Sequence, residues 1–319
     1  MKLLFLSDIH VMVSRPKARL DNNIKQTLER KLTYVFDWAE ERNAVILQAG
    51  DFVETPRNWH LLPWLQEFLF QWGKYPLLHL VYGQHDLYQH SEESKKATIL
   101  GVLETAKLIR ILTAEPVMIE GEPSVYLYGC SYGQQVPKPI ISRAERHLNI
   151  LVIHRMVLSK KIWQKQIEYD WAPKFLREHN QYDFILCGDY HYKFLYHTND
   201  GRTILNTGCM LRKTASVKDI QHKPGFFVHD TDWERGQVRW YPIPHATAGK
   251  VLTRKHLEKQ LEVDETMDEL ATQIAKRAKK ARGKKVVNFE NALLNFMDVN
   301  KTHSGVRNFV LQALRSGGK

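Results

Sequence analysis

Five short apolar runs, each followed directly by polar side chains, constrain the fold of this chain more than any other feature. The polar groups are Asp8 and His10, Gly50-Asp51, Gly83-Gln84-His85-Asp86, His154, and Gly188-Asp189-Tyr190-His191. In open α/β sheets, ligands bind beyond the carboxyl ends of the strands. Because side chains of this kind follow five separate runs, we expect an α/β fold in which the five loops meet at one site.

Strand-like and helix-like segments alternate through the first part of the chain. The apolar runs predict buried strands at Lys2–Ser7, Val45–Gln48, Leu77–Tyr82, Leu148–Ile153, Asp183–Cys187 and Thr203–Asn206. Helical spacing predicts helices over Ile24–Ala39, with Asp21 as N-cap, and over Leu62–Trp72, ended by Gly73. Later segments are typical of antiparallel strands: Val125–Tyr132, Gly225–His229 and Gln237–Pro242. The pattern predicts a layered α/β sandwich of mixed sheets flanked by helices.

The pattern changes near Pro242–Gly249, a segment with the composition of a connector. We therefore expect two domains, residues 1–246 and 247–319. Of the net charge of +11, most lies in the tail: residues 250–319 carry 15 Lys and Arg against 8 Asp and Glu, and residues 1–249 carry 31 against 27. Helical spacing at Met267–Ala278 and Val306–Leu314 predicts a small helical domain. Its basic charge suits nucleic acid, although it also serves solubility.

The cellular compartment follows from what the sequence lacks. Its three cysteines form no CxxC pair, which argues against a disulfide framework or a zinc cage. The N-terminal apolar stretch, Leu3–Leu6, is short, and no small-residue cleavage site follows it. No apolar run reaches the length of about 18 residues that spans a bilayer. We expect a cytoplasmic protein without a membrane partner.

Carboxylate, imidazole and amide groups together suit a pair of divalent cations. A phosphodiester resists attack because its oxygens are anionic. Two cations about 3.5–4 Å apart neutralise that charge, activate a water molecule and hold the leaving oxygen. A histidine that is not a ligand can then protonate the leaving group. The polar groups therefore predict a phosphoesterase site.

The motif order DxH, GD, G(N)HD, a lone His and GxxH resembles that of calcineurin-like metallophosphoesterases. Within that superfamily the chain is similar to SbcD-type nucleases, the exonuclease subunits of SbcCD complexes, and the segment Asn206–Thr214 (NTGCMLRKT) resembles theirs. The resemblance implies a four-layer sandwich with a small basic C-terminal domain that caps DNA or binds the ATPase. It also implies a two-metal DNA nuclease, exonucleolytic and in some relatives endonucleolytic, acting in DNA end processing or recombination. Its partners would be DNA, an SbcC-like coiled-coil ATPase and a second copy of the chain.

The resemblance also assigns roles to individual residues. It implies that one metal is held by Asp8, His10, Asp51 and His191, and the other by Asp51 as the bridge with Gln84, His154 and Asp189. It implies that His85 is the catalytic histidine and that Asp86 orients it. Gln84 stands where the family has Asn, and Asp189 where it has His. Because both replacements ligate through oxygen, we expect Mn²⁺, with Mg²⁺ as the alternative, in preference to zinc.

Residues outside these motifs are interpreted separately. His90 and Arg212 are candidate DNA contacts, as are Lys279 and Lys280 within the basic run 276–285. Glu54, three residues after Asp51, is interpreted as an exposed loop carboxylate. A phosphatase or a small-molecule or cyclic-nucleotide phosphodiesterase is the alternative function, since it would use the same metal site. The basic tail favours the nuclease, because a small substrate needs no basic extension.

Overall fold

Two six-stranded mixed sheets form the centre of residues Met1–Thr253. The computed structural model describes residues 1–72, 78–144, 146–161, 169–255, 267, 273 and 289–316. The first sheet has the order β14 (Arg239–Pro242), β13 (Gly225–Asp230), β1 (Lys2–Leu6), β2 (Ala44–Gln48), β3 (Leu78–Leu80), β4 (Arg110–Ile111). The second has the order β11 (Phe194–His197), β12 (Thr203–Asn206), β10 (Phe184–Cys187), β7 (His147–Ile153), β6 (Ser124–Cys130), β5 (Val117–Ile119). A small parallel pair joins β8 (Val157–Leu158) to β9 (Asp170–Trp171).

The middle of each sheet is parallel and its edges are antiparallel. Strands β1 to β4 run parallel to one another, and so do β6, β7, β10 and β12. Strands β13 and β14 extend the first sheet in antiparallel register, and β5 and β11 close the second in the same way. One expectation is corrected here: β6 pairs with β7 in parallel over seven residues and is antiparallel only to β5.

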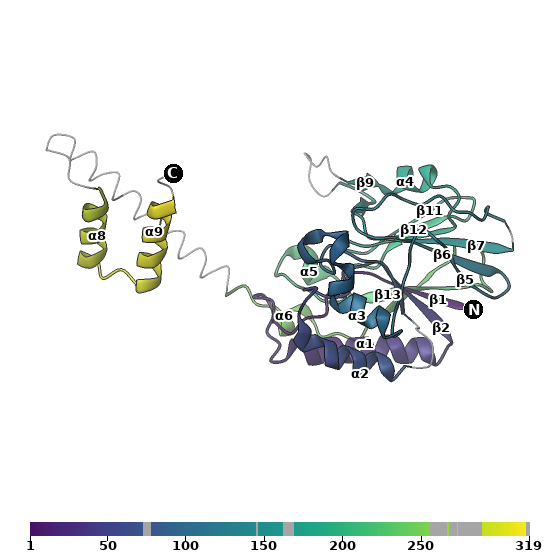
Figure 1. Ribbon diagram of the computed structural model, residues 1–319, viewed down its shortest axis with the longest axis horizontal. Helices are drawn as coiled ribbons and strands as arrows, with labels where there is room; N and C mark the ends of the chain where they lie inside the picture. Colours follow the sequence, from purple (N-terminus) through teal and green to yellow (C-terminus); the bar gives the residue numbers. More distant parts are fainter. Residues whose placement is uncertain are drawn as a thin grey trace. The chain divides into compact units, whose positions relative to one another are not determined.

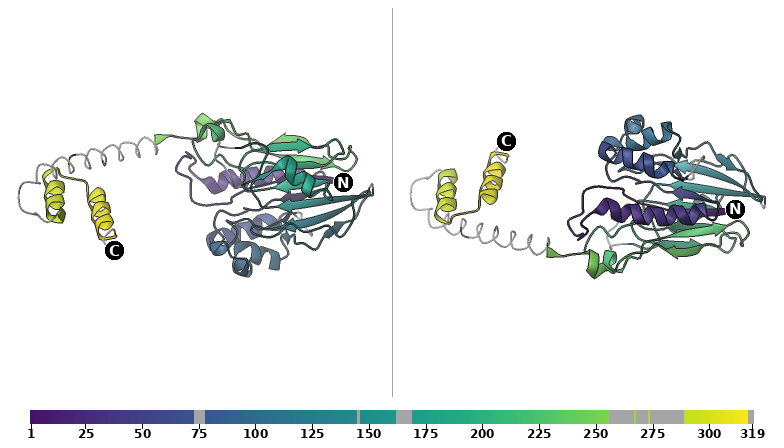
Figure 2. Two further views of the ribbon diagram at one scale, coloured as in Figure 1. Left: turned by 90° about the horizontal axis from the view of Figure 1, so that it is seen from above. Right: turned by 90° about the horizontal axis from the view of Figure 1, so that it is seen from below.

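Helices cover the outer faces of the two sheets, so the fold has four layers (Figure 1). Helices α1 (Ile24–Glu40), α2 (Leu62–Phe70) and α3 (Ile99–Thr105) share a buried cluster with the first sheet. Helix α4 (Ala172–Glu178) packs on the second sheet through Phe175 and Leu176. The turned views of Figure 2 show α1 and α4 on opposite sides of the paired sheets. The four-layer α/β sandwich expected from the sequence is confirmed.

The inner faces of the sheets meet in a second apolar core. Leu3, Phe5 and Leu47 of the first sheet lie in one cluster with Ile150 and Phe184 of the second. The rings of Phe5 and Phe184 stack with centroids 5.7 Å apart. Both faces of each central strand are therefore buried, which explains why these strands are apolar runs rather than alternating ones.

The start of α1 differs from the sequence expectation. Asn23 is the N-cap, because its side-chain oxygen accepts a hydrogen bond from the amide of Gln26 (3.1 Å). Asp21 instead accepts two hydrogen bonds from Arg19, at 2.6 and 2.8 Å. Both residue types suit an N-cap, and Asn23 takes the role because it directly precedes Ile24, the first helical residue.

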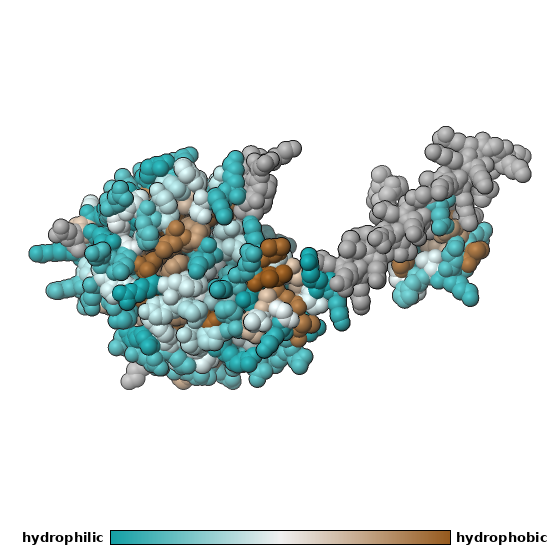
Figure 3. All heavy atoms as spheres, turned by 180° about the vertical axis from the view of Figure 1, so that it is seen from behind, coloured by the Kyte–Doolittle hydropathy of each residue, from teal (hydrophilic) through white to brown (hydrophobic). Residues whose placement is uncertain are grey.

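Shorter elements complete the first unit. They are the helices α5 (Val217–Gln221) and α6 (Ala248–Val251) and the 3-10 helices η1 (Trp59–Leu61), η2 (Tyr88–His90) and η3 (Glu92–Ala97). On the face of the molecule drawn in Figure 3, hydrophilic residues cover most of this unit and hydrophobic ones lie in small groups.

The second unit, Arg254–Lys319, contains helices α8 (Phe289–Val299) and α9 (Ser304–Ser316). Leu293, Phe296 and Met297 of α8 are buried, while Phe309 of α9 is exposed. Arg307 of α9 pairs with Asp298 of α8. Most of the segment predicted to be helical at Met267–Ala278 lies outside the described residues, as do Lys279, Lys280 and the rest of the basic run 276–285. In the part of the chain that is described, no helix is long and apolar enough to cross a bilayer.

Candidate metal centre

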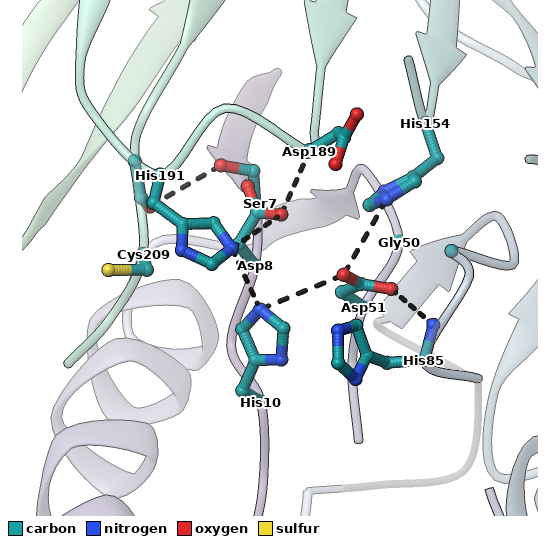
Figure 4. A network of polar contacts seen from close by, with 12 residues as sticks. Ser7, Asp8, His10, Gly50, Asp51, His85, His154, Asp189, His191 and Cys209 are labelled. Carbon is teal, nitrogen blue, oxygen red and sulfur yellow. Dashed lines mark hydrogen bonds and ion pairs between the residues drawn. The ribbon is translucent and has the colours of Figure 1, made fainter. Parts of the chain in front are cut away.

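The loops after β1, β2, β3, β7 and β10 meet at one edge of the paired sheets (Figure 4). Hydrogen bonds join the loops of the two sheets, and two of them involve the backbone. The amide of Asp189, after β10, donates to Asp8 Oδ1 (2.9 Å), and His154 Nδ1, after β7, donates to the carbonyl of Ala49 (2.6 Å). The five polar groups of the sequence are therefore brought together by the packing of the sheets.

One group of ligand atoms comes from Asp8, His10, Asp51 and His191. One nitrogen or oxygen from each of the four lies within 4.8 Å of all the others. The Nε2 atom of His10 is 3.1 Å from His191 Nε2 and 3.7 Å from Asp51 Oδ2. The Nε2 atom of His191 is 4.0 Å from Asp8 Oδ1. These are the spacings of atoms that face a common centre.

A second group lies on the other side of Asp51. Nε2 of His154 is 3.6 Å from Asp51 Oδ2 and 2.6 Å from Gln84 Oε1. The side-chain amide of Gln84 donates to Asp189 Oδ1 (2.9 Å). Because His154 donates from Nδ1 to a carbonyl, its Nε2 is the atom available to a metal. Asp51 thus stands between the two groups, the position of a bridging ligand.

The protein's own groups fit divalent cations in charge and in hydrogen bonding. Among the described residues, Asp8 Oδ2 and Asp51 Oδ2 are buried without a hydrogen-bond partner. Burial raises the pKa of Asp8 and of Asp51 to about 7 and lowers the pKa of His10 to about 3 and of His191 to about 4. Buried carboxylates beside unprotonated imidazoles are stabilised by bound cations, because the cation supplies the missing charge.

Backbone strain gathers at the same place. Asp8, His10, Asp51 and Asp189 all have positive φ angles, between 47° and 77°. Residues other than glycine adopt this region at a cost, and such residues cluster at functional sites. The strained backbone therefore indicates that the conformation of these loops is set by the positions that their side chains must take.

Glycines allow the loops to approach closely. A Cβ on Gly83 would overlap both Oδ1 and the amide nitrogen of Asp51. A Cβ on Gly188 would overlap the carbonyl of Ala49 and lie 2.6 Å from His154 Nδ1. The glycines of the GQHD and GDYH motifs are thus required by the packing of neighbouring ligand loops.

Residues 1–193 match the family described as Calcineurin-like phosphoesterase. The chain belongs to this family. It is therefore a phosphoesterase of a metal-dependent hydrolase family, and its cluster of metal-competent side chains agrees with that membership. A comparison of the sequence with curated proteins yields no match.

Two solved structures are similar to this phosphoesterase at low sequence identity. The calcineurin-like phosphoesterase YfkN from Bacillus subtilis is 13% identical, with 79% of this chain and 92% of that chain covered and a TM-score of 0.45. A 5'-nucleotidase precursor from Thermus thermophilus is 11% identical, with 85% of this chain and 59% of that chain covered and a TM-score of 0.43. At these TM-scores the two likenesses add nothing to the family assignment.

Sequence reasoning missed the position of Glu54 in this phosphoesterase. Its carboxylate lies 2.7 Å from His10 Nδ1 and 2.7 Å from the ammonium group of Lys213. A carboxylate behind a metal-binding histidine sets the orientation of its ring and raises its basicity. The available signal was the position of Glu54 on the same loop as Asp51.

The segment after β12 supports the ligand loops from behind. Ser7 Oγ donates to Asn206 Oδ1 (3.1 Å), the amide of Cys209 donates to the His191 carbonyl (3.1 Å), and the amide of Met210 donates to the Asp8 carbonyl (3.3 Å). The stretch Asn206–Thr214 that stood out in the sequence therefore braces the first group of ligands and carries Lys213 to Glu54.

The expected contact between Asp86 and His85 is corrected by the structure. The carboxylate of Asp86 is buried and accepts hydrogen bonds from the amides of Phe52, Val53 and Gly83 at 2.9–3.2 Å. His85 Nδ1 instead donates to the carbonyl of Glu54 (3.0 Å). Asp86 fixes the loop after Asp51 rather than the histidine ring, because its side chain turns back into the protein.

Two candidate DNA contacts differ in their accessibility. His90 is exposed, and its Nδ1 donates to the carbonyl of Gln84 (3.1 Å), so its ring lies beside the metal centre. Arg212 is only 6% exposed and donates to the carbonyls of His222 and Ala246, both at 2.8 Å. Its burial is incompatible with the expected contact to DNA.

Proposed function

We propose that this phosphoesterase is a two-metal DNA nuclease of the SbcD type, which hydrolyses phosphodiester bonds during DNA end processing. The observation that carries the proposal is a groove of about 380 Å³ beside the metal centre. It runs past Arg15, Lys17 and Lys213 and includes Glu54, whose carboxylate already pairs with Lys213. A basic groove that continues from the metal centre suits the phosphate backbone of a polymer.

The chemistry divides between cations and side chains. Held by the two ligand groups around Asp51, divalent cations would neutralise the phosphate oxygens and lower the pKa of an attacking water molecule. His85 donates from Nδ1 to the Glu54 carbonyl, which leaves Nε2 to carry the proton that goes to the leaving oxygen. The ring lies edge-on to His10 with centroids 5.0 Å apart, beside the ligands it serves.

The ligand set supports Mn²⁺ as the working metal. The second group offers oxygens from Asp51, Gln84 and Asp189 and one nitrogen from His154. Oxygen-rich sets of this kind favour Mn²⁺ or Mg²⁺ over Zn²⁺. Activity that peaks with Zn²⁺ would contradict this part of the proposal.

The C-terminal unit is the proposed contact for DNA and for a coiled-coil ATPase of the SbcC type. Helices α8 and α9 leave Val299 79% and Phe309 65% exposed. Exposed large apolar side chains suit a protein partner, and the basic composition of the C-terminal sequence suits a polyanion. Homodimerisation belongs to the same proposal.

The test is cleavage of end-labelled linear duplex and single-stranded DNA, with Mn²⁺, Mg²⁺ or EDTA, by the wild type and by His85→Ala. We expect Mn²⁺-dependent cleavage that falls at least about 100-fold in the variant, the usual contribution of a general acid.

The groove is tested with Arg15→Ala/Lys17→Ala, which should slow DNA cleavage and leave hydrolysis of bis-p-nitrophenyl phosphate unchanged. Lys138→Ala/Lys174→Ala, which removes two exposed cations outside the groove, is the matched control for lost charge. Hydrolysis of the small diester while all DNA stays intact would overturn the nuclease proposal.

A further inference from the structure

A second cavity, of about 300 Å³, lies apart from the metal ligands in the first unit. It is bounded by Arg19, the first turns of α1, Arg212 and the segment from Pro244 to Val251. The chain leaves the first unit here, because Leu20 and Thr253 form backbone hydrogen bonds that join residues 18–20 to residues 251–253. None of the lining residues is a candidate metal ligand.

The lining is strongly basic and partly buried. Its charged side chains are Arg19, Arg30, Lys31 and Arg212 against the single carboxylate of Asp21. Arg19, Lys31 and Arg212 are 4%, 7% and 6% exposed. Buried charges in proteins are normally paired, since an unpaired buried charge is costly.

The available carboxylates do not balance these cations. Asp21 is occupied by Arg19, which it binds at 2.6 and 2.8 Å. Asp219 acts on Arg212 only at longer range, and its own oxygens accept from the amide of Thr214 and the hydroxyl of Tyr192. Lys31 and Arg212 are thus left with no ion-pair partner among the described residues.

Both cations also keep donors that point at no protein acceptor in the described part of the chain. The ammonium group of Lys31 donates to the carbonyl of Met210 (2.6 Å), which uses one of three hydrogens. Arg212 uses Nε and Nη1 on the carbonyls of His222 and Ala246, and its Nη2 has no acceptor among these residues. Burial and the neighbouring Arg19 lower the pKa of Lys31 to about 7, as expected for like charges without a counterion.

We propose that this cavity is an anion site in which Lys31 and Arg212, with Arg30 at its mouth, bind a phosphate group, free or as a monoester. The charge and the unused donors match a phosphate dianion. Pro224, Pro244 and Val251 add apolar wall, and the volume is at the lower end for small-molecule sites. The cavity therefore has room for a small organic group on the phosphate.

Met210 connects this site to the metal centre. The carbonyl of Met210 accepts from Lys31, and the amide of Met210 donates to the carbonyl of Asp8. An anion that draws Lys31 toward itself would thus act on the segment that braces the first ligand group. The proposal does not depend on which phosphodiester the metal centre cleaves.

The test is binding to the full-length chain, stripped of metal with EDTA and then desalted, by calorimetry at constant ionic strength. Orthophosphate and 5'-dAMP are the probes, and chloride is the reference anion. We expect saturable binding of one anion per chain that weakens at least about tenfold in Lys31→Met, since a charge-assisted hydrogen bond is lost. Arg30→Ala changes an exposed side chain, so it should fold normally and bind several-fold more weakly. Lys174→Met should bind as the wild type does.

The outcomes separate the two sources of the phosphate group. Tighter binding of 5'-dAMP than of orthophosphate assigns a monoester, and the reverse order assigns free phosphate. In addition, phosphate should raise the melting temperature of the wild type more than that of Lys31→Met at the same phosphate concentration. The proposal is overturned if the wild type shows no saturable binding, or if Lys31→Met and Arg30→Ala both bind with wild-type affinity.

Discussion

Asp51 is the residue around which the metal centre is built. Its Oδ2 faces His10 and His154 at 3.7 and 3.6 Å, and its Oδ1 accepts the amide of His85 at 2.8 Å. One carboxylate therefore faces both ligand groups and also positions the backbone of His85, the proposed catalytic histidine. The neighbouring Glu54 extends the same loop to the far side of the His10 ring.

Glu54→Gln removes a charge from behind His10 and keeps the size of the side chain. We expect the affinity for Mn²⁺ to fall about 10–100-fold, the usual effect of losing a carboxylate partner of a metal-binding histidine. The dissociation constant measured by calorimetry checks this, with Glu92→Gln, which removes a surface carboxylate from Lys95, as the control. An unchanged dissociation constant would show that Glu54 does not position His10.

The pH dependence of metal binding follows from the carboxyl groups. Because burial raises the pKa of Asp8 and Asp51 to about 7, both hold protons below that pH, and a cation must displace them. His10 and His191 have lowered pKa values and are already unprotonated from pH 5 upward. Metal affinity should therefore increase as the pH rises from 6 to 8 and level off above 8.

Calorimetry in buffers of different ionisation enthalpy measures the protons released. We expect release of up to two protons per chain at pH 6 and almost none at pH 8.5. The free energy of unfolding changes in the opposite direction. Because their pKa values are raised, Asp8 and Asp51 hold more protons in the folded chain than in the unfolded chain between pH 4 and 7, so their contribution to stability decreases as the pH rises through 7. A bound metal offsets this decrease in stability. Proton release that is the same at both pH values would contradict the assignment.

At the scale of elements, the site depends on how closely parallel strands bring their loops together. Strands β1, β2 and β3 are neighbours in one sheet, and β7 and β10 are neighbours in the other. Each ligand loop leaves its strand at the same edge, so the loops touch. Gly83 and Gly188 stand where a side chain would separate them.

Gly83→Ala places a methyl group against the carboxylate and amide of Asp51. We expect loss of metal-dependent activity and a decrease of about 1–3 kcal/mol in the free energy of unfolding, as for overpacked sites. Denaturant titration and hydrolysis of a chromogenic diester measure the two effects. Gly249→Ala, where nothing lies within 4 Å, is the control and should leave both unchanged. A Gly83→Ala protein with normal activity would show that the loops can separate without harm.

At the scale of the whole molecule, the two units carry different parts of the proposed function. All candidate metal ligands lie within Met1–Thr253, together with the apolar core that joins the two sheets and the one between the first sheet and its helices. The chain from residue 250 onward carries 15 of the 46 Lys and Arg. Such a division predicts that chemistry and polymer binding can be separated.

A chain truncated after Thr253 should fold and hydrolyse bis-p-nitrophenyl phosphate at the rate of the full chain. Its cleavage of DNA should fall at least about tenfold at 150 mM salt, because the removed basic charge contributes to phosphate binding. Comparing the two rates over a salt series provides the measurement. Equal DNA cleavage by both chains would remove the C-terminal unit from the proposed function.

The sequence alone determined which residues could meet, because apolar runs that end in Asp, His or Gly-Asp are strands buried on both faces with ligands at their ends. Strand and helix positions followed from the same periodicity, and the family match confirms the expected metallophosphoesterase family. Tertiary structure decided what no local pattern encodes. Glu54 contacts His10 and Asp86 holds backbone amides because loops from different strands pack together. Likewise β6 is parallel to β7, and Arg212 lines a buried basic cavity, because partners distant in the sequence meet only in the folded chain.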